Sequence, residues 1–203
     1  MLNTRNLGLL SVLFLVLGAT SAFATVKKTD CLHKRNTICR NMNKLNPKMD
    51  LKEAYKISNL FSKMAKKYKI SPTLLVSIAF QESSFKADAI RKVTGLVFDE
   101  DSNEYKKVRV GSDFCMMQIH LININKMDLK VDKLLNSPSY CIEAGAKILS
   151  RYKGLYGKKD KNWWTHYNAK TKAKQKIYFN KVTRHLTKID TKNDVARVVA
   201  STK

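Results

Sequence analysis

The sequence lacks the marks of a nucleotide-binding, repetitive or multidomain protein. It contains no glycine-rich phosphate loop, no internal repeat and no long linker. Acidic residues are also scarce, since 16 Asp and Glu stand against 39 Lys and Arg, which gives a formal net charge of +23. The chain has 203 residues, 44% of them hydrophobic, which is enough to form one compact core. The composition therefore indicates a single, strongly basic globular domain.

Long apolar runs are confined to the N-terminus. Leu9 to Leu17 is almost wholly apolar, but it is too short, and too soon followed by polar residues, for a membrane span. Arg5 precedes this run and an A-x-A pattern ends it at Ala24, as in a secretory signal peptide. We therefore expect residues 1–24 to be removed and the mature protein to be periplasmic, without a stable membrane span. An uncleaved N-terminal anchor is the alternative.

Cysteine is sparse, and all four cysteines lie beyond the predicted signal peptide, at Cys31, Cys39, Cys115 and Cys141. An even number of cysteines in an exported chain indicates disulfides. Three pairings are possible. We favour Cys31–Cys39, which closes a short local loop, and Cys115–Cys141, which ties two segments of the main domain. Cys31, His33 and Cys39 suggest a metal site instead, but a fourth ligand is not evident.

The positive charge is spread along the chain rather than gathered into one arm. Such charge favours polyanions, which could be nucleic acid, anionic lipid headgroups or anionic cell-wall polymers. Export ranks cell-wall polymers above nucleic acid, and the chain lacks the aromatic residues that interleave with a basic face in nucleic-acid binders. We therefore expect no nucleic-acid partner. The alternative is that the lysines only cover a solvated surface.

Hydrophobic periodicity predicts four main helices, so we expect a mainly α fold. The first three begin at recognisable N-caps, and glycine is expected to end the third. These helices start at Asp50 (with Glu53 as in a capping box), at Ser71-Pro72, at Ser137-Pro138 (ending at Gly154), and at Ala173 (running to Leu186).

A β-hairpin is expected between the second and third helices. Residues 95–98 and 105–110 are typical of strands, and the polar residues 99–103 would form the turn. The segment from Asp113 to His120 is apolar and carries one buried-looking amide, Gln118. Around the predicted domain of residues 50–187, we expect a basic N-terminal segment (25–49) ordered mainly by its disulfide, and a basic, loosely ordered tail (188–203).

One carboxylate, Glu82, lies on an apolar helical stripe that begins at Leu74. Because desolvation disfavours the charged form, a buried Glu must find a partner or have a raised pKa. With a raised pKa, Glu82 could stay protonated near neutral pH and act as a general acid. The alternative is a Glu at the edge of the stripe, held by a lysine or a backbone N–H.

Five short motifs then follow one another in an order that resembles the lytic transglycosylase family. They are Glu82-Ser83-Ser84-Phe85, Met116-Met117-Gln118-Ile119, Ala144-Gly145-Ala146, Tyr167-Asn168-Ala169, and Tyr178 with Val182. The resemblance covers about residues 50–187 and implies a single lysozyme-like domain, shared with goose-type lysozymes, that carries a small β-hairpin insertion. The hairpin makes the chain similar to the short transglycosylases of conjugation and type IV or type III secretion machines.

The resemblance implies a role for each matched residue. Glu82 would be the catalytic acid/base. The residues implied to bind substrate are Met117 and Gln118 beside Glu82 in the cleft, Tyr167 and Asn168 opposite it, and Tyr178 on the last helix, which would close the pocket. Plain core packing is the alternative for Met117 and the tyrosines, and a structural amide is the alternative for Gln118.

The sequence departs from the family pattern at three positions. Cys115 stands where the family usually has glycine, and Cys141 where it usually has asparagine. Two positions that change to cysteine together are consistent with a disulfide replacing a polar packing contact. Lys170 replaces a glycine that often follows the Tyr-Asn-Ala motif, which leaves the conformation of that loop open. We assign no role to His120.

The carboxylates indicate the chemistry. Lysozyme-type hydrolysis generally needs a second Asp or Glu at about 5–9.5 Å from the first. None of the acids from Asp88 to Asp113 lies on a firm apolar face beside Glu82, although Asp113 would matter if it faced the cleft. A mechanism with one carboxylate is therefore favoured.

The resemblance supplies such a mechanism. It implies cleavage of peptidoglycan glycan strands between N-acetylmuramic acid and N-acetylglucosamine, which yields 1,6-anhydro ends without a metal or cofactor. Components of a secretion or conjugation machine are the further partners it suggests. The alternatives are a hydrolytic goose-type lysozyme, a catalytically idle wall-binding scaffold and, last, a nucleic-acid binder.

Overall fold

The central element of the fold is the helix α4 (Pro72–Ser83). The computed structural model describes residue 31 and residues 36–100 and 102–189. Every residue of α4 from Thr73 to Ala79 is buried, so this helix has neighbours on all sides rather than on one face. It starts as predicted, because the Ser71 hydroxyl accepts a hydrogen bond from the Leu74 N–H.

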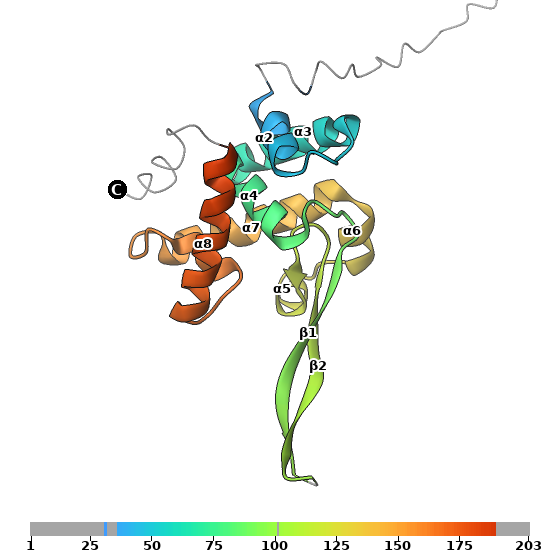
Figure 1. The fold of residues 1–203 in the computed structure, drawn as a ribbon, viewed down its shortest axis with the longest axis vertical. Helices are drawn as coiled ribbons and strands as arrows, with labels where there is room; N and C mark the ends of the chain where they lie inside the picture. Colours follow the sequence, from blue (N-terminus) through green and yellow to red (C-terminus); the bar gives the residue numbers. More distant parts are fainter. Residues whose placement is uncertain (1–30, 32–35, 101, 190–203) are drawn as a thin grey trace, which may run out of the picture.

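The other helices enclose α4 directly or through one another. The helices that contact α4 are α2 (Thr37–Leu45), α3 (Leu51–Tyr68) and α8 (Lys172–Ile189). The helix α7 (Pro138–Tyr156) packs on α3, on the short helix α6 (Val131–Asn136) and on the 3-10 helix η1 (Trp163–Tyr167). In Figure 1, α2 and α3 lie at the top of the body and α8 runs down its left side. The fold is mainly helical with a small antiparallel sheet, as predicted.

Helix starts follow their local signals more closely than helix ends do. The Asp50 carboxylate accepts hydrogen bonds from the N–H groups of Lys52 and Glu53, both at 3.0 Å, and α3 begins at the next residue as expected. The end predicted for α7 is wrong, because the helix passes through Gly154 and continues to Tyr156. A glycine inside a helix weakens it only slightly, and here the chain stays helical through Gly154.

The N-terminal segment contains a helix that the sequence analysis missed. Ile38, Met42 and Leu45 of α2 belong to the main hydrophobic core, and Asn36 caps the helix by accepting a hydrogen bond from the Cys39 N–H. Cys39 is bonded to Cys31, which is the pairing favoured from the sequence. Apolar packing therefore orders this segment together with the disulfide, whereas we had expected the disulfide to dominate.

Residues 1–30 and 190–203 lie outside the described part of the chain. The predicted signal peptide and most of the predicted basic tail fall on them. Among the described residues, none of the helices combines the length and the apolar character that crossing a membrane requires.

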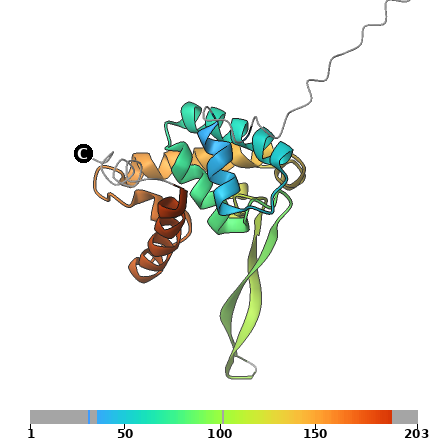
Figure 2. The same cartoon turned by 45° about the horizontal axis from the view of Figure 1, so that its top comes forward.

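The predicted hairpin is present and extends beyond the expected strands. β1 (Ile90–Asp99) pairs antiparallel with β2 (Glu104–Phe114), and β2 pairs with the short β3 (Ile119–His120), which leads into α5 (Leu121–Lys126). The hairpin projects far from the helical body in both Figure 1 and Figure 2. Its base is therefore the part that can contribute to a site on the body.

A β-bulge near the base changes which residues of the hairpin face each other. The register shifts between Val93 and Thr94. Between this shift and the base of the hairpin, Arg91 pairs with Asp113. If the register set at the turn had continued, Arg91 would instead lie opposite Ser112. Because directly opposed residues share one face of a sheet, the bulge brings a cation and a carboxylate together.

The second disulfide ties the turn after β2 to α7. Cys115 is bonded to Cys141 as favoured from the sequence, with their Cα atoms 6.2 Å apart. Cys115 has a φ of 61°, in the left-handed region that glycine adopts most readily. This conformation explains why glycine would suit position 115. In this chain the disulfide holds Cys115 in the same conformation.

Gly145 in α7 provides the space for Met117. A Cβ atom added at Gly145 would lie 2.6 Å from Cε, 2.8 Å from Cγ and 3.0 Å from Cβ of Met117. The contact with Met117 Cβ means that a side-chain rotation alone could not relieve the overlap. The Ala-Gly-Ala motif therefore lets the turn that carries Met117 approach α7 closely.

This contact predicts opposite effects for two glycine substitutions in the same helix. Gly145→Ala should lower the free energy of unfolding by about 1–3 kcal/mol because it overpacks the core. Gly154→Ala, the matched control, should raise it by about 0.5–1 kcal/mol because its side chain would meet open space. Urea denaturation of both variants tests this, and equal effects would contradict the packing explanation.

Candidate active site

Glu82 lies in the last turn of α4, with only 8% of the residue exposed. The helix ends at the next residue, Ser83, because Ser84 and Phe85 adopt positive φ values of 55° and 70°. The Ser83 hydroxyl then donates a 2.8 Å hydrogen bond to the Met116 carbonyl, which joins this end of α4 to the turn between β2 and β3. The position of Glu82 is therefore fixed by the helix that precedes it and by the Ser83 hydrogen bond that follows it.

Two neutral donors from distant parts of the chain contact the carboxyl group. The Tyr178 hydroxyl, on α8, donates a 2.7 Å hydrogen bond to Oε1 of Glu82. Nδ2 of Asn168, which follows η1, lies 3.3 Å from Oε1 and 3.4 Å from Oε2. The structure therefore brings together Glu82, Asn168 and Tyr178, which were all expected at the site.

Burial raises the pKa of Glu82 above its ordinary value, because desolvation disfavours the carboxylate. Three neighbours oppose this effect and favour the charged form: the Tyr178 hydrogen bond, the charge of Arg91 and the Asn168 hydrogen bond. The negative charge of Asp113 acts in the same direction as burial. The net shift is upward, which suits a group that must donate a proton to a substrate.

Arg91 and Asp113 form an ion pair beside Glu82 that the sequence analysis did not foresee. Arg91 donates to Oδ2 of Asp113 from Nε at 3.0 Å and from Nη2 at 2.7 Å. The same Nη2 atom lies 3.7 Å from Oε2 of Glu82. The expectation that no other acid lies beside Glu82 was therefore wrong, because the bulge in the hairpin turns Asp113 into the cleft.

The structure places Met117 outside the cleft and Gln118 in its lining. The Met117 side chain is fully buried against Gly145 and does not line the cleft, so its expected place there was wrong. Gln118 does line the cleft, but its Nε2 donates to the carbonyl groups of Ala89 and Cys115, at 3.2 and 2.9 Å. Its amide therefore stabilises the surrounding loops.

Tyr167 connects the two sides of the site. Its hydroxyl donates a 2.7 Å hydrogen bond to the Met117 carbonyl, and burial raises its pKa well above the ordinary value. The hydroxyl therefore stays protonated and acts as a fixed donor. Met117 contributes through its backbone, which holds Tyr167 in the wall of the cleft.

A second group of contacts supports the loop that carries Asn168. The His166 ring stacks on Tyr156 with centroids 3.8 Å apart, and its Nε2 lies 3.3 Å from a carboxylate oxygen of Asp160. Gln175 donates a 3.1 Å hydrogen bond to the Ala169 carbonyl. Lys170 is not among the residues with positive φ, so this loop does not require the glycine that is common there.

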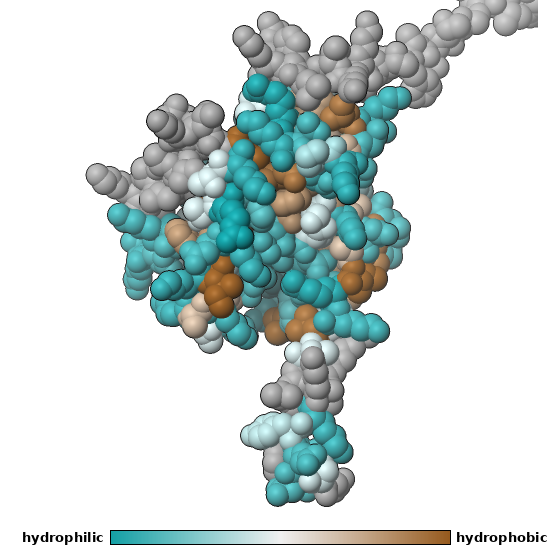
Figure 3. Space-filling view, viewed as in Figure 1, coloured by the Kyte–Doolittle hydropathy of each residue, from teal (hydrophilic) through white to brown (hydrophobic). Residues whose placement is uncertain are grey.

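The carboxyl group of Glu82 lies on a cleft of about 760 Å³, between the base of the hairpin on one side and η1 with α8 on the other. Figure 3 shows the surface indented between the lower part of α8 and the hairpin. The lining residues are Glu82, Arg91, Lys92, Val93, Asp113, Gln118, His120, Ile122, Asn123, Lys126, Tyr152, His166, Tyr167, Asn168, Ala169, Lys170, Thr171 and Lys174. Most of these residues are polar, and polar groups in a cleft can fix the orientation of a ligand by hydrogen bonds.

The described residues contain no cluster of three His, Cys, Asp or Glu side chains that could hold a metal ion. The groups that surround the buried Glu82 carboxyl group are its hydrogen-bond donors and the Arg91–Asp113 ion pair. Such an arrangement can protonate an ether oxygen and then accept a proton. The mainly helical fold with its small antiparallel sheet defines a domain of the lysozyme-like class.

Comparison with known families agrees with that class. The model of the transglycosylase SLT domain matches residues 59–186, which is more than half of the chain, and the chain therefore belongs to this family. Members of the family are peptidoglycan lytic transglycosylases, which are glycosidic-bond lyases, so peptidoglycan is the substrate. Neither the search of curated proteins nor that of solved structures gave a match.

The raised pKa of Glu82 predicts how stability depends on pH. Between the ordinary Glu pKa and the raised one, the folded state binds more protons than the unfolded state, so stability falls as pH rises. Glu82→Gln removes this loss, so its advantage in free energy of unfolding should grow as pH rises above the ordinary Glu pKa and level off above the raised one. Denaturation at a series of pH values measures it.

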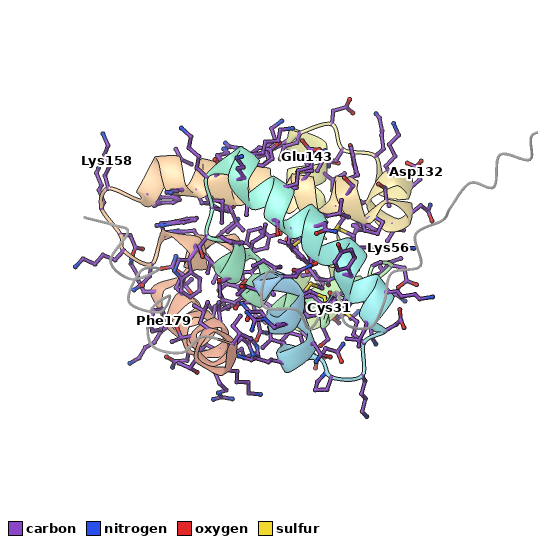
Figure 4. The ribbon with its side chains drawn as sticks, turned by 90° about the horizontal axis from the view of Figure 1, so that it is seen from above. Cys31, Lys56, Asp132, Glu143, Lys158 and Phe179 are labelled. Carbon is purple, nitrogen blue, oxygen red and sulfur yellow. A yellow bond between two sulfur atoms is a disulfide. The ribbon has the colours of Figure 1, made fainter. Side chains whose placement is uncertain are left out.

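Glu143→Gln is the matched control for that series. The hydrogen bond from Lys67 lowers the pKa of Glu143, so the stability that this substitution loses should develop between the lowered pKa and the ordinary Glu pKa and stay constant at higher pH. Figure 4 shows Glu143 on α7, at the edge of the molecule. Parallel pH profiles for the two variants would contradict the assignment of a raised pKa to Glu82.

The Tyr178 hydrogen bond predicts a shift in the pH profile of activity. Tyr178→Phe removes a donor that favours the carboxylate, so the pKa of Glu82 should rise further. The upper pH limit of kcat/KM on solubilised peptidoglycan should then move up by about one unit, since hydrogen bonds to charged groups contribute about 1.5–3 kcal/mol. Tyr68→Phe, which removes a similar hydrogen bond to Glu143 outside the cleft, should leave the limit unchanged.

Proposed function

We propose that Glu82 is the catalytic acid/base of this enzyme and that the product carries a 1,6-anhydroMurNAc end. The observation that carries the proposal is the Glu82 carboxyl group itself. It is buried at the floor of the cleft, has a raised pKa, and is aligned by Asn168 and Tyr178. A protonated carboxyl group in this position can act on a glycosidic oxygen of a strand lying in the cleft.

The proposed reaction has two steps. Glu82 first donates its proton to the oxygen between N-acetylmuramic acid and N-acetylglucosamine, and the bond from this oxygen to the anomeric carbon breaks. The substrate's own N-acetyl oxygen stabilises the cationic centre at that carbon. The Glu82 carboxylate then accepts the proton of the muramoyl C6 hydroxyl, whose oxygen bonds to the anomeric carbon. No water is consumed, and Glu82 returns to its protonated form.

The other residues of the site have supporting roles in this proposal. Asn168 and Tyr178 orient the carboxyl group, and Tyr167 and Gln118 form the walls that hold the sugar ring. Arg91 holds Asp113 through two hydrogen bonds to one oxygen, which ties that carboxylate to the protein. This favours the mechanism in which Glu82 is the only reacting carboxylate.

A hydrolytic muramidase is the second candidate, and the position of Asp113 is the observation that favours it. Asp113 lines the same cleft as Glu82, and one nitrogen of Arg91 approaches both carboxyl groups. A second carboxylate so close could activate a water molecule or stabilise the cationic centre. The product would then be a reducing end in place of an anhydro end.

The biological setting we propose is local opening of the wall for an envelope-spanning secretion or conjugation machine, after export and removal of residues 1–24. The support is the resemblance to the short transglycosylases that serve such machines. The projecting hairpin between the Glu82 segment and the Met117 segment is part of that resemblance.

Mass spectrometry of muropeptides tests the reaction and the residue together. Purified sacculi are incubated with the mature protein, with Glu82→Gln and with Asp113→Asn. Anhydro products should appear with the native protein, and Glu82→Gln should lower the rate at least about a hundredfold. If Glu82→Gln retained full activity, another acid would have to be responsible.

Asp113→Asn separates the two candidate reactions. A transglycosylase should still form anhydro ends with this variant, although more slowly because Arg91 loses its partner. A muramidase would give products heavier by one water with the native protein, and these would disappear with Asp113→Asn. Binding of sacculi by native protein and Glu82→Gln alike, with no product from either, would instead indicate a wall-binding scaffold.

A further inference from the structure

Four lysines stand at the edges of the active-site cleft, two on each side. Lys92 on β1 and Lys126 on α5 belong to the side formed by the hairpin base. Lys170, in the loop after η1, and Lys174 on α8 belong to the opposite side. All four are exposed, and none has an acidic partner within the described part of the chain. We call these four residues the lysine rim.

The charge of the lysine rim is not balanced inside the cleft. Among the described residues that line the cleft, Glu82 and Asp113 are the only acidic ones, and both are buried at its floor. Asp113 is paired with Arg91, and Glu82 must carry its proton to act as the acid. A ligand in the cleft therefore meets a nearly neutral floor and two positive edges, and a groove with one sign of charge concentrates ligands of the opposite sign.

The chemistry of the glycan strand does not explain such edges by itself. Its N-acetylated sugar rings are uncharged, and the carboxylates of peptidoglycan belong to the substituents of muramic acid. They occur on the stem peptide or, where that peptide has been removed, on the lactyl group. Substituents on a strand lying along the floor would extend toward the edges, where the lysines are.

We propose that the lysine rim binds carboxylates on the muramoyl substituents, so that the enzyme prefers strands whose carboxylates are free over strands whose carboxylates are amidated. This inference rests on the proposed function, because it takes the glycan strand to be the ligand of the cleft. It assigns the lysine rim a role in substrate selection, separate from the chemistry at Glu82.

The high overall charge requires a control, since lysines occur all over this surface. Lys56 and Lys63 on α3 are exposed and lie outside the cleft lining. Lys56 is labelled on α3 in Figure 4, and α3 lies at the top of Figure 1, away from the hairpin base. Lys56→Gln/Lys63→Gln therefore changes the net charge as much as a pair of rim substitutions does, without changing the cleft.

The test compares kcat/KM of the mature protein and three double variants on three substrates. The variants are Lys92→Gln/Lys126→Gln, Lys170→Gln/Lys174→Gln and the α3 control. The substrates are peptidoglycan strands with free carboxylates, the same strands amidated with carbodiimide and ammonium, and strands stripped of stem peptides by an amidase, which keep only lactyl carboxylates.

On strands with free carboxylates, each rim variant should lose about three- to tenfold in kcat/KM, as expected for two partly exposed ion pairs. The control should change much less, and all proteins should cleave amidated strands at similar, lower rates. The native preference should disappear at about 0.5 M salt, where screening is strong. If the native protein still prefers stripped strands over amidated strands, the contact lies at the lactyl group. If this preference is lost on stripped strands, the contact lies at the stem peptide.

Two outcomes separate this inference from the proposed function. If all proteins cleave free and amidated strands equally, the lysine rim has no selective role, although the enzyme assignment stands. If nothing is cleaved, co-sedimentation of the same variants with free and amidated sacculi decides the inference. If binding to sacculi depends on both the lysine rim and free carboxylates, the inference is supported even without catalysis. If binding depends on neither, the inference is overturned.

Discussion

The burial of one carboxyl group, that of Glu82, is the constraint on which the rest of the site depends. An isolated carboxylate among apolar side chains is strongly disfavoured, so each neighbouring element supplies a group that makes it tolerable. Tyr178 from α8 and Asn168 from the end of η1 donate hydrogen bonds, and Arg91 from β1 adds a nearby positive charge. These contacts are too weak to cancel the effect of burial, so the pKa of Glu82 stays above its ordinary value.

The positions of these donors depend on packing elsewhere. Gly145 lets Met117 approach α7, the Met117 carbonyl holds Tyr167, and the chain from Tyr167 continues directly to Asn168. The Cys115–Cys141 disulfide joins the same turn to α7 covalently. A substitution at Gly145 or at either cysteine should therefore shift the positions of the residues that donate hydrogen bonds to Glu82, although the substituted residue itself does not contact the substrate. This continuity explains why a methionine that does not line the cleft still belongs to a motif of the family.

The floor and the edges of the cleft differ in their electrostatics. Its floor contains the acids and keeps their net charge small through burial and through the Arg91–Asp113 pair, as proton transfer requires. Its edges carry the lysines of the rim, whose positive charge suits attraction of an anionic polymer. Because the two layers use different residues, selection of the substrate and the reaction itself could change independently during evolution.

The sequence by itself determined the features that depend on neighbours in the chain. The caps Asp50 and Ser71, the stripe that buries Glu82 and the existence of the hairpin follow from local hydrogen bonding and periodicity. The order of the motifs also indicated the family, and with it Asn168 and Tyr178. Gly154 shows the limit of local signals, since whether a glycine ends a helix depends on what surrounds it.

Only the tertiary structure decided how Arg91, Asp113, Met117 and the lysine rim are placed. A one-residue bulge puts Arg91 opposite Asp113 where the turn register would have put Ser112, and such a slip changes which side chains face the cleft. Met117 is excluded from the cleft by a contact with Gly145 on a distant helix. These arrangements involve residues far apart in the sequence, and no local preference of either partner specifies the distance between them.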